Sequence, residues 1–286
     1  RKRRYAFSES FAAIAYGELF KATGEKHYAE KARRTFDRFI SHNLDPRGVD
    51  PKFTDVRPMK SLGFPMITIT TAQELRDSIG LTDAEEWIDR SIDEIRRDHL
   101  KPELQCVLEN VGTNGEIIDH FDGRMLNPGH AIEASWFIMQ EGKIRNDPSL
   151  INTGCQILDW SWERGWDNEF GGILYFVDMN GIPVQEYWHD MKFWWPQAEA
   201  IIATIFAFSL TGDPKYVEWH RQVHEWAYRF FPDPDPEHGE WFGYLHRDGS
   251  VSSTLKGNLW KGPFHVPRMK LISWQLLESL PDERAL

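Results

Sequence analysis

The sequence predicts an all-α fold, a toroid of helical hairpins with short β-hairpins between its C-terminal helices. Three observations predict it: apolar residues recur at helical spacing, strongly apolar helices alternate with amphipathic ones, and the turns between them repeat. Helices enclosed in a ring are apolar all round, whereas helices outside them keep one wet face. The alternation therefore predicts inner and outer helices paired into hairpins.

Five apolar helices are expected to form the inner layer. At steps of 56 to 71 residues, they begin near Ser8, Phe64, Pro128, Pro196 and Pro267. Each step leaves room for one helix out and one helix back. Four amphipathic outer helices are expected between them, roughly over residues 25–40, 83–99, 148–162 and 213–231.

The turns between these helices carry stop and start signals. The sequence TGEKHY at residues 23–28 ends one helix and starts the next, and TGDPKY at residues 211–216 repeats it. Residues 166–175 and 237–244 form a second repeat rich in glycine and aromatic residues, and each segment is followed by a turn that contains glycine. Each of these two segments predicts a short β-hairpin between helices.

The number of expected helices leaves the ring open. Six hairpins need twelve helices and nine are expected here, so about three would precede Arg1. We expect a single barrel domain over residues 1–286, incomplete at its N-terminus, with exposed apolar surface and poor stability as an isolated polypeptide. The first ten residues, RKRRYAFSES, are basic but lack the apolar run of a secretory signal.

Composition narrows the class of function. Lys and Arg number 33 against 44 Asp and Glu, so the net charge is −11, and nucleic acid is not expected as a partner. The longest apolar run, residues 200–210, is too short to span a membrane. Cys106 and Cys155 lie far apart, which favours neither a disulfide framework nor a zinc site and fits a cytoplasmic protein.

Other motifs of known chemistry are missing or weak. The sequence contains no nucleophile-elbow, phosphate-loop or dinucleotide-binding glycine pattern. His220 and His224 have the i, i+4 spacing of metal ligands, but they lack the glutamate of a zinc-protease motif and lie on an expected outer helix. No metal is therefore predicted.

Candidate catalytic residues gather at the expected helix starts. Asn127 and Pro128 are typical of a helix cap and the first helical residue, which puts His130 in the first turn. The positive end of the helix dipole disfavours imidazolium, so we expect a neutral ring that can accept a proton. Glu133 shares its face of the helix. Spacing alone is also consistent with a purely structural role for both residues.

Two later helix starts repeat this arrangement. Glu199 would face the enclosed axis of an almost uncharged helix, where a carboxylate needs a partner or a task. His265 is expected just before the last inner helix, with Arg268 one turn onward, although each alone is also consistent with a structural role. Because successive hairpins bring their helix starts to one rim, we expect these residues to converge, with Glu9 as a further candidate.

Six stretches, in family order over nearly the whole chain, resemble the N-acylglucosamine 2-epimerase family. They are FSESFAAIAYGEL (7–19), VLENV (107–111), LNPGHAIEASWF (126–137), KFWWPQAEA (192–200), GEWFGYL (239–245) and GPFHVPR (262–268). The resemblance implies an (α/α)6 barrel that acts on the reducing end of a sugar without metal or redox cofactor. It also implies that an active-site arginine belongs to a preceding segment.

Carried over position by position, the resemblance implies that His130 and His265 are the acid/base pair. It implies a substrate pocket lined by Glu133, Glu199, Arg268, Glu9, Trp195 and Gln197, with Gln197 standing where some members carry a histidine. A nucleotide (ATP) activator and a homodimer are implied by the family alone, since no residue here marks either site.

The expected reaction interconverts N-acylglucosamine and N-acylmannosamine. One histidine removes the C2 proton and the other returns a proton to the opposite face, through an enediolate. Arg268 would stabilise the developing negative charge, while Glu133 and Glu199 would orient a histidine or the sugar hydroxyls. The alternatives are an aldose–ketose isomerase or disaccharide 2-epimerase on the same barrel, a glycoside hydrolase using Glu133 and Glu199, and a non-catalytic sugar-binding barrel.

Overall fold

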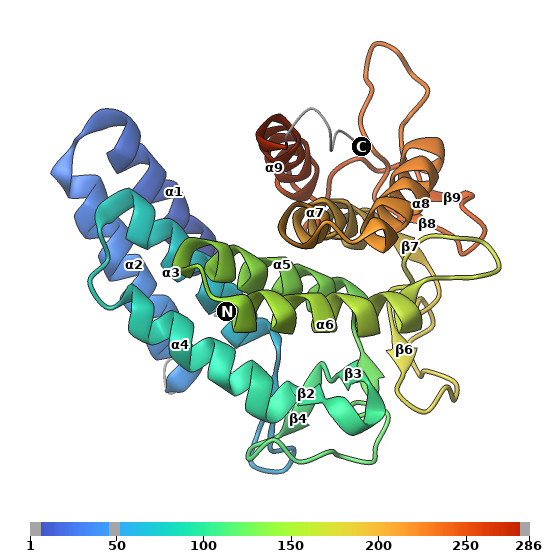
Figure 1. Cartoon of the computed structure of the whole chain (residues 1–286), viewed down its shortest axis with the longest axis horizontal. Coiled ribbons are helices and arrows are strands. Elements are labelled where there is room, and N and C mark those ends of the chain that lie inside the picture. Colours follow the sequence, from blue (N-terminus) through green and yellow to red (C-terminus); the bar gives the residue numbers. More distant parts are fainter. Residues whose placement is uncertain (1–6, 46–51, 281–286) are drawn as a thin grey trace. The chain divides into compact units, whose positions relative to one another are not determined.

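The computed structural model describes residues 7–45 and 52–280, and most of them lie in helices joined as antiparallel pairs (Figure 1). The basic stretch before Phe7 lies outside the described residues. The chain divides into two compact units, Arg1–Leu100 with Asn110–Ile118, and Lys101–Glu109 with Asp119–Leu286. Both units are built from helical hairpins, so the all-α prediction is confirmed.

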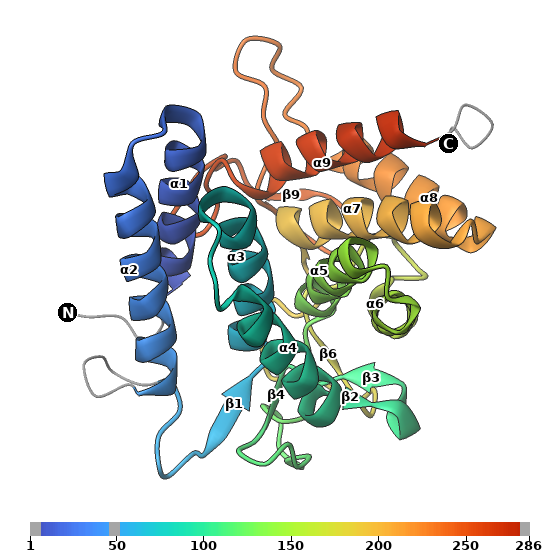
Figure 2. The same cartoon turned by 60° about the vertical axis from the view of Figure 1, so that its left-hand side comes forward.

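The first unit contains two helical hairpins, which Figure 2 shows. They are formed by α1 (Phe7–Thr23) with α2 (Lys26–Leu44), and by α3 (Gly63–Ile79) with α4 (Ala84–Glu94), which continues as a π-helical turn, η2 (Ile95–His99). Gly24 links α1 to α2 at φ +73°, a left-handed conformation that only glycine adopts without strain. The unit also contains one antiparallel strand pair, β1 (Met59–Ser61) with β4 (Asn110–Gly112).

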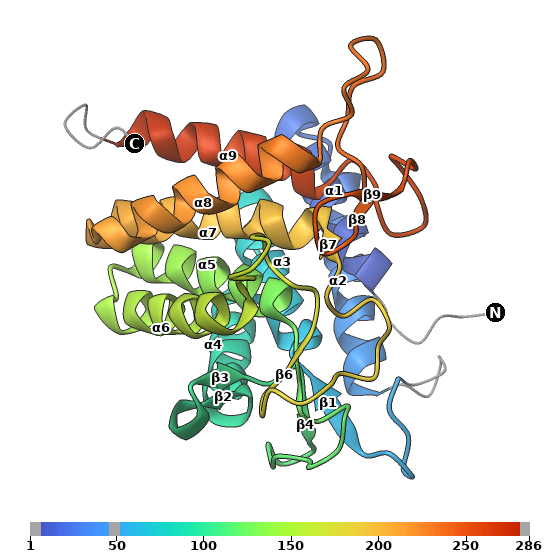
Figure 3. The same cartoon turned by 90° about the vertical axis from the view of Figure 1, so that its right-hand side faces the viewer.

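The second unit contains the remaining five described helices, which Figure 3 shows together. They are α5 (Pro128–Arg145) paired with α6 (Pro148–Gly165), α7 (Trp194–Thr211) paired with α8 (Pro214–Phe230), and α9 (His265–Ser279). Helix α7 packs against α5, α8 and α9, and every residue from Trp194 to Ala207 is buried. The apolar sequence of α7 thus reflects its central place in this unit.

Short strands connect the helices of the second unit. Strand β5 (Met125–Leu126) pairs with β6 (Val177–Asp178), and β7 (Lys192–Phe193), β8 (Tyr244–Leu245) and β9 (Val251–Ser253) form an antiparallel sheet. The remaining short elements are β2 (Leu100–Lys101), η3 (Pro102–Leu104) and β3 (Cys106–Val107).

The second of the two predicted β-hairpins is confirmed, because β8 and β9 pair antiparallel across the turn that follows residues 237–244. The first is reduced to a single bridge, Trp166 with Ile173. In the first, Gly171 and Gly172 are consecutive residues with φ +75°, which interrupts the extended backbone that a longer ladder needs.

The inner helices begin within two residues of the expected positions, with two corrections. Proline is predicted as the first residue of α7 and α9, but Pro196 and Pro267 each occupy the third position. The N–H groups of a whole first turn lack helical partners, so proline is tolerated at more than one position there. His265 is therefore the first residue of α9 rather than a loop residue, and Glu199 lies in the second turn of α7.

Two of the apolar helices expose large side chains. Helix α1 exposes Phe11 and Leu19, and α9 exposes Leu271, Trp274 and Leu277. By contrast, α5 and α7 bury nearly all of their apolar residues. The expected exposure of apolar inner-helix surface is therefore confined, among the described helices of this layer, mainly to α1 and α9.

An ion cluster that the sequence analysis does not predict, with Asp167 and Lys192 buried and Arg247 partly exposed, fixes the loop after α6. Asp167 accepts hydrogen bonds from Lys192 Nζ (2.9 Å) and from Nε and Nη2 of Arg247 (2.8 and 3.0 Å). Lys192 also donates to the Gly172 carbonyl. Burial lowers the pKa of Lys192 to about 8, although Asp167 acts in the opposite direction. The cluster ties residues 167–172 to strand β7, which leads directly into α7.

Candidate active site

The start of α5 has the predicted cap. Asn127 Oδ1 accepts a hydrogen bond from the backbone N–H of His130 (3.2 Å), and Pro128 is the first helical residue. The cap satisfies one of the otherwise unpaired amides of the first turn. It thereby sets the position of His130, whose side chain is about one-third exposed.

Glu109 binds the His130 ring and was missed by the sequence analysis. Its Oε2 lies 3.0 Å from Nδ1 of His130, and its side chain is almost completely buried. The backbone N–H of Glu109 donates to the Met125 carbonyl, which places the carboxylate beside the start of α5. The available signal was a lone carboxylate in the apolar stretch CVLENV, because a buried carboxylate needs a partner.

A second histidine–carboxylate pair joins α9 to α7. His265 Nδ1 lies 2.7 Å from Oε1 of Glu199, which is fully buried. The other oxygen of Glu199 accepts a hydrogen bond from the indole N–H of Trp136 (2.9 Å), on α5. Three successive inner helices therefore contribute to one polar cluster, as the converging helix starts predicted.

Arg268 completes this cluster. Its Nη2 donates to Oε1 of Glu133 (2.5 Å) and to Oε1 of Glu199 (2.7 Å). The guanidinium lies over the rings of Trp136 and Phe264, which adds cation–π attraction. Arg268 neutralises one of the two negative charges of Glu133 and Glu199. Its structural role is therefore to hold these two carboxylates together. The prediction that it stabilises substrate charge is not tested by these contacts.

The donor atoms of Glu133, Glu199 and His265 lie within 4.8 Å of one another, a spacing that would also suit a metal ion. A single guanidinium nitrogen bridges both carboxylates, however, so the cluster already contains a cation. The same bridge places a guanidinium nitrogen between Glu133 and Glu199, where a glycoside hydrolase would hold the scissile bond. This geometry argues against the glycoside hydrolase alternative, in which two carboxyl groups flank the scissile bond.

Glu199 makes stability dependent on pH. Burial alone would raise the pKa of Glu199, but the charge of Arg268 and the hydrogen bond from His265 outweigh burial and hold it at about 2. A carboxyl group whose pKa falls on folding stabilises the protein above its unfolded pKa, and this stabilisation is lost as pH falls toward the folded pKa.

We therefore expect the native chain to lose about 3 kcal/mol of this contribution between about pH 5 and pH 2. Chemical denaturation across this range should show the gap in unfolding free energy between the native chain and Glu199→Gln narrowing as pH falls. A constant gap would contradict the assignment.

Trp195 contacts both candidate catalytic rings. Its ring centroid lies 5.1 Å from that of His130 and 5.7 Å from that of His265. The edge of the six-membered ring of the indole fits against Gly129, where an added Cβ would lie 2.6 Å from two of its ring carbons. Trp195 thus couples the positions of the two histidines, and Gly129 provides the space for it.

Replacing Gly129 with alanine is expected to displace Trp195. The overpacking should cost about 1–3 kcal/mol, partly offset by the better helix propensity of alanine. Because misplacing catalytic groups by about 1 Å can cost roughly 10²-fold in rate, kcat should fall more than stability alone explains. Thermal unfolding and steady-state kinetics test this. Gly257→Ala, whose Cβ would meet only an ordinary 3.6 Å contact, is the matched control.

The structure gives one predicted pocket residue, Gln197, a different role. Gln197 is fully buried, and its amide pairs with both the N–H (2.8 Å) and the carbonyl (2.9 Å) of Ile173. Its side chain therefore anchors the loop after α6 to α7 and has no exposed surface for substrate. Glu9 lies near the start of α1 in the first unit, and its role in substrate binding stays a prediction.

Among the described residues, no third metal-ligating side chain lies close to both His220 and His224 of α8. His220 lies 3.2 Å from the Thr204 hydroxyl, and burial lowers its pKa to about 4, so its ring is neutral near pH 7. His224 stacks on Tyr228 instead. Packing therefore accounts for both residues.

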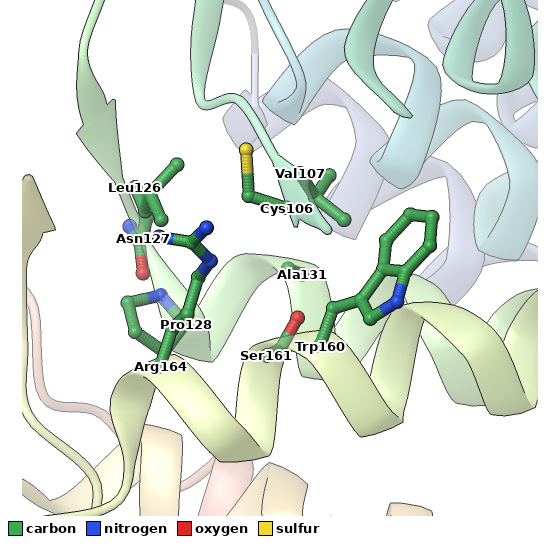
Figure 4. Close-up of a pocket in the computed structure, with 9 residues that line it drawn as sticks. All are labelled: Cys106, Val107, Leu126, Asn127, Pro128, Ala131, Trp160, Ser161 and Arg164. Carbon is green, nitrogen blue, oxygen red and sulfur yellow. The ribbon is translucent and has the colours of Figure 1, made fainter. Parts of the chain in front are cut away.

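A small hollow lies beside the capped start of α5, as Figure 4 shows. It is lined by Cys106, Pro128 and Trp160, together with Asn127, and has room for little more than one water molecule. Burial raises the pKa of the Cys106 thiol, so this cysteine is not an activated nucleophile. The hollow includes neither His130 nor His265, and we place no chemistry in it.

A family model for N-acylglucosamine 2-epimerase (GlcNAc 2-epimerase) matches residues 1–265. The chain belongs to the N-acylglucosamine 2-epimerase family. The N-acylglucosamine 2-epimerase of Bos taurus is 37% identical over 97% of this chain and 66% of its own length. That of Mus musculus is 38% identical over 97% of this chain and 67% of its own length. The chain thus spans about two thirds of the length of these relatives.

The fold is also that of a solved sugar 2-epimerase. The structure of cellobiose 2-epimerase from Bacillus thermoamylovorans matches with a TM-score of 0.79 over 94% of this chain and 71% of its own, at 17% identity. The chain therefore has the helical fold of the (α/α)6-barrel class, as the resemblance implied. None of its described helices combines the length and apolarity that a membrane span requires.

Proposed function

We propose that the site of this epimerase-family chain interconverts N-acylglucosamine and N-acylmannosamine by moving the proton at C2. The observation that supports this most directly is the pair of histidines, each bound to a buried carboxylate and both in contact with the indole of Trp195. Two imidazoles on one site can act on two faces of a substrate. The curated relatives named above support the choice of substrate.

The chemistry begins with the open-chain sugar, in which the C2–H bond is weakened by the adjacent C1 aldehyde. One imidazole takes the proton at its nitrogen, and the electron pair of the C2–H bond moves to form the C1–C2 double bond of an enolate. Because C2 carries nitrogen in an N-acylhexosamine, this intermediate is an enolate; the enediolate forms only from sugars with a C2 hydroxyl. The other imidazole, as imidazolium, gives a proton to the opposite face of C2 and inverts it.

The charges of the site suit this exchange. Each carboxylate partner stabilises its histidine when the ring is protonated, so the acid and the base can exchange roles in the reverse reaction. Glu133, Glu199 and Arg268 together carry one negative charge in excess, which an imidazolium at His265 neutralises.

The decisive test uses solvent deuterium. Purified protein is incubated with N-acetylglucosamine in D2O, and NMR follows both the C2 proton and the appearance of N-acetylmannosamine. We expect deuterium at C2 together with the manno product. A ketose product would identify an aldose–ketose isomerase, and turnover of cellobiose alone would identify a disaccharide 2-epimerase. If the folded protein binds these sugars without exchange, a non-catalytic sugar-binding role is the better explanation.

We extend the proposal to the setting of the enzyme. Free Cys106 and Cys155 fit a reducing compartment, which supports a cytoplasmic location. Neither metal nor redox cofactor is needed for a proton transfer between imidazoles and a carbon acid. A nucleotide activator and a homodimer follow from the family resemblance alone. Activity with and without ATP, and light scattering during gel filtration, test them.

A further inference from the structure

Two groups compete for the same nitrogen of His130. Nδ1 lies 3.0 Å from Oε2 of Glu109 and also 3.0 Å from Nδ2 of Asn127. The carboxylate can only accept a hydrogen bond, whereas the amide nitrogen can only donate one. A proton on Nδ1 therefore satisfies Glu109, and a lone pair on Nδ1 satisfies Asn127.

The helix cap fixes which end of the Asn127 amide meets the ring. Its Oδ1 accepts from the backbone N–H of His130, so the NH2 group is the end that lies next to Nδ1. Turning the amide over would place two donors against one another and lose the cap. The competing donor is thus a consequence of how α5 begins.

We infer that Glu109 is a positioning residue that fixes the tautomer of His130: it keeps a proton on Nδ1 against Asn127, so that Nε2 carries the lone pair. A hydrogen bond to a buried carboxylate is roughly twice as strong as one between neutral groups. Glu109 is 5% exposed, so water does not weaken this bond appreciably. The Glu109 bond therefore outweighs the Asn127 bond.

This assignment tells the two histidines apart. His265 Nδ1 also has a carboxylate partner, but its neighbouring donor, Arg268 Nη2, lies 3.4 Å away and is already bound to two carboxylates. No comparable donor competes for Nδ1 of His265 among the described residues, whereas the proton on Nδ1 of His130 depends on Glu109. The catalytic consequence rests on the proposed function, since Nε2 must accept the C2 proton.

The tautomer can be read directly by NMR. In protein labelled with ¹⁵N-histidine, long-range ¹H–¹⁵N correlations distinguish a protonated Nδ1 from a protonated Nε2, and His130→Gln identifies the signals of His130. At about pH 8.5, where ordinary imidazoles are neutral, we expect His130 to carry its proton on Nδ1. A proton on Nε2 in the unaltered protein would overturn the inference without any need for activity.

Variants of Glu109 and Asn127 test whether these two residues compete for Nδ1 of His130. In Glu109→Gln the carboxylate is gone, and we expect the proton to move largely to Nε2. In Glu109→Gln combined with Asn127→Ser, the serine keeps the cap acceptor but removes the competing NH2, so the population with Nδ1 protonated should rise again. If the double variant stays like the single one, Asn127 is not the competitor. Glu141→Gln removes another buried carboxylate from α5, at its Arg145 pair, and should leave the His130 signals unchanged.

Kinetics separate this inference from the proposed function. We expect Glu109→Gln to lower kcat roughly 10²-fold or more with little change in KM, as happens when the carboxylate that orients a catalytic histidine becomes an amide. Glu109→Asp should retain more activity because it keeps the charge. Equal kcat for the native chain and a Glu109→Gln variant with a shifted tautomer would overturn the catalytic role. If the tautomer shifts but the native protein turns over no N-acylhexosamine, the proposed function fails and the tautomer assignment stands.

Discussion

His265→Asn is expected to stop epimerisation while leaving one half of the proton exchange intact. Asparagine preserves the polarity and approximate size of the side chain but has no basic nitrogen. Loss of one acid/base group should lower kcat roughly 10²- to 10⁴-fold. The remaining histidine can still remove and return a proton on its own side of C2. In D2O, the variant should therefore exchange the C2 proton of one epimer without converting it to the other.

His130→Asn should show the mirror-image result. If N-acetylglucosamine exchanges in one variant, N-acetylmannosamine should exchange in the other, which assigns each ring to one face of the sugar. His238→Asn, an exposed histidine paired with Asp235, is the matched control and should leave both reactions unchanged. Wild-type epimerisation by a folded His265→Asn or His130→Asn would contradict the two-histidine assignment.

Arg268→Met is expected to be the most destabilising single change at the site. It leaves the buried carboxylates of Glu133 and Glu199 without their shared cation. Removing one partner from a buried ion pair costs about 3–5 kcal/mol because the remaining charge is uncompensated. Unfolding in denaturant should show this loss, and kcat should fall because His265 is no longer held by a fixed Glu199.

The cause of this loss can be separated from simple loss of packing. Adding Glu133→Gln and Glu199→Gln to Arg268→Met removes the unpaired charges and should recover part of the stability but none of the activity. Arg221→Met, which removes exposed ion pairs on α8, should cost only about 0–1 kcal/mol. Similar losses for Arg268→Met and Arg221→Met would contradict the role of burial.

Helices were the part of the fold most visible in the sequence, because both the apolar period and the end signals act locally. The period distinguished the buried α7 from the amphipathic α8, and Asn127 with Pro128 gave the start of α5 to the residue. The starts of α7 and α9 were displaced by two residues because proline fits several positions of a first turn. Local signals thus identify an element more securely than its ends.

The missed parts of the site depend on contacts between distant segments. Glu109 reaches His130 from a loop 21 residues earlier, and Trp136 reaches Glu199 across 63 residues. Neither pairing leaves a periodic trace in the sequence. Gln197 shows the converse, because the family resemblance implied a role in the pocket, whereas its side chain pairs with the backbone of Ile173. The spacing of residues in the sequence predicts which side chains meet at the helix starts. It does not predict the hydrogen-bond partners, from distant segments, that hold those side chains in place.

The Asp167–Lys192–Arg247 cluster has a practical consequence for labelling experiments. The pKa of Lys192 is lowered to about 8 only while the side chain is buried, and there the amine is wholly inaccessible. An amine-reactive reagent can reach it only when the loop at residues 167–172 opens. The rate of Lys192 acylation, followed by mass spectrometry, would therefore measure how often the loop at residues 167–172 opens locally while the rest of the protein stays native.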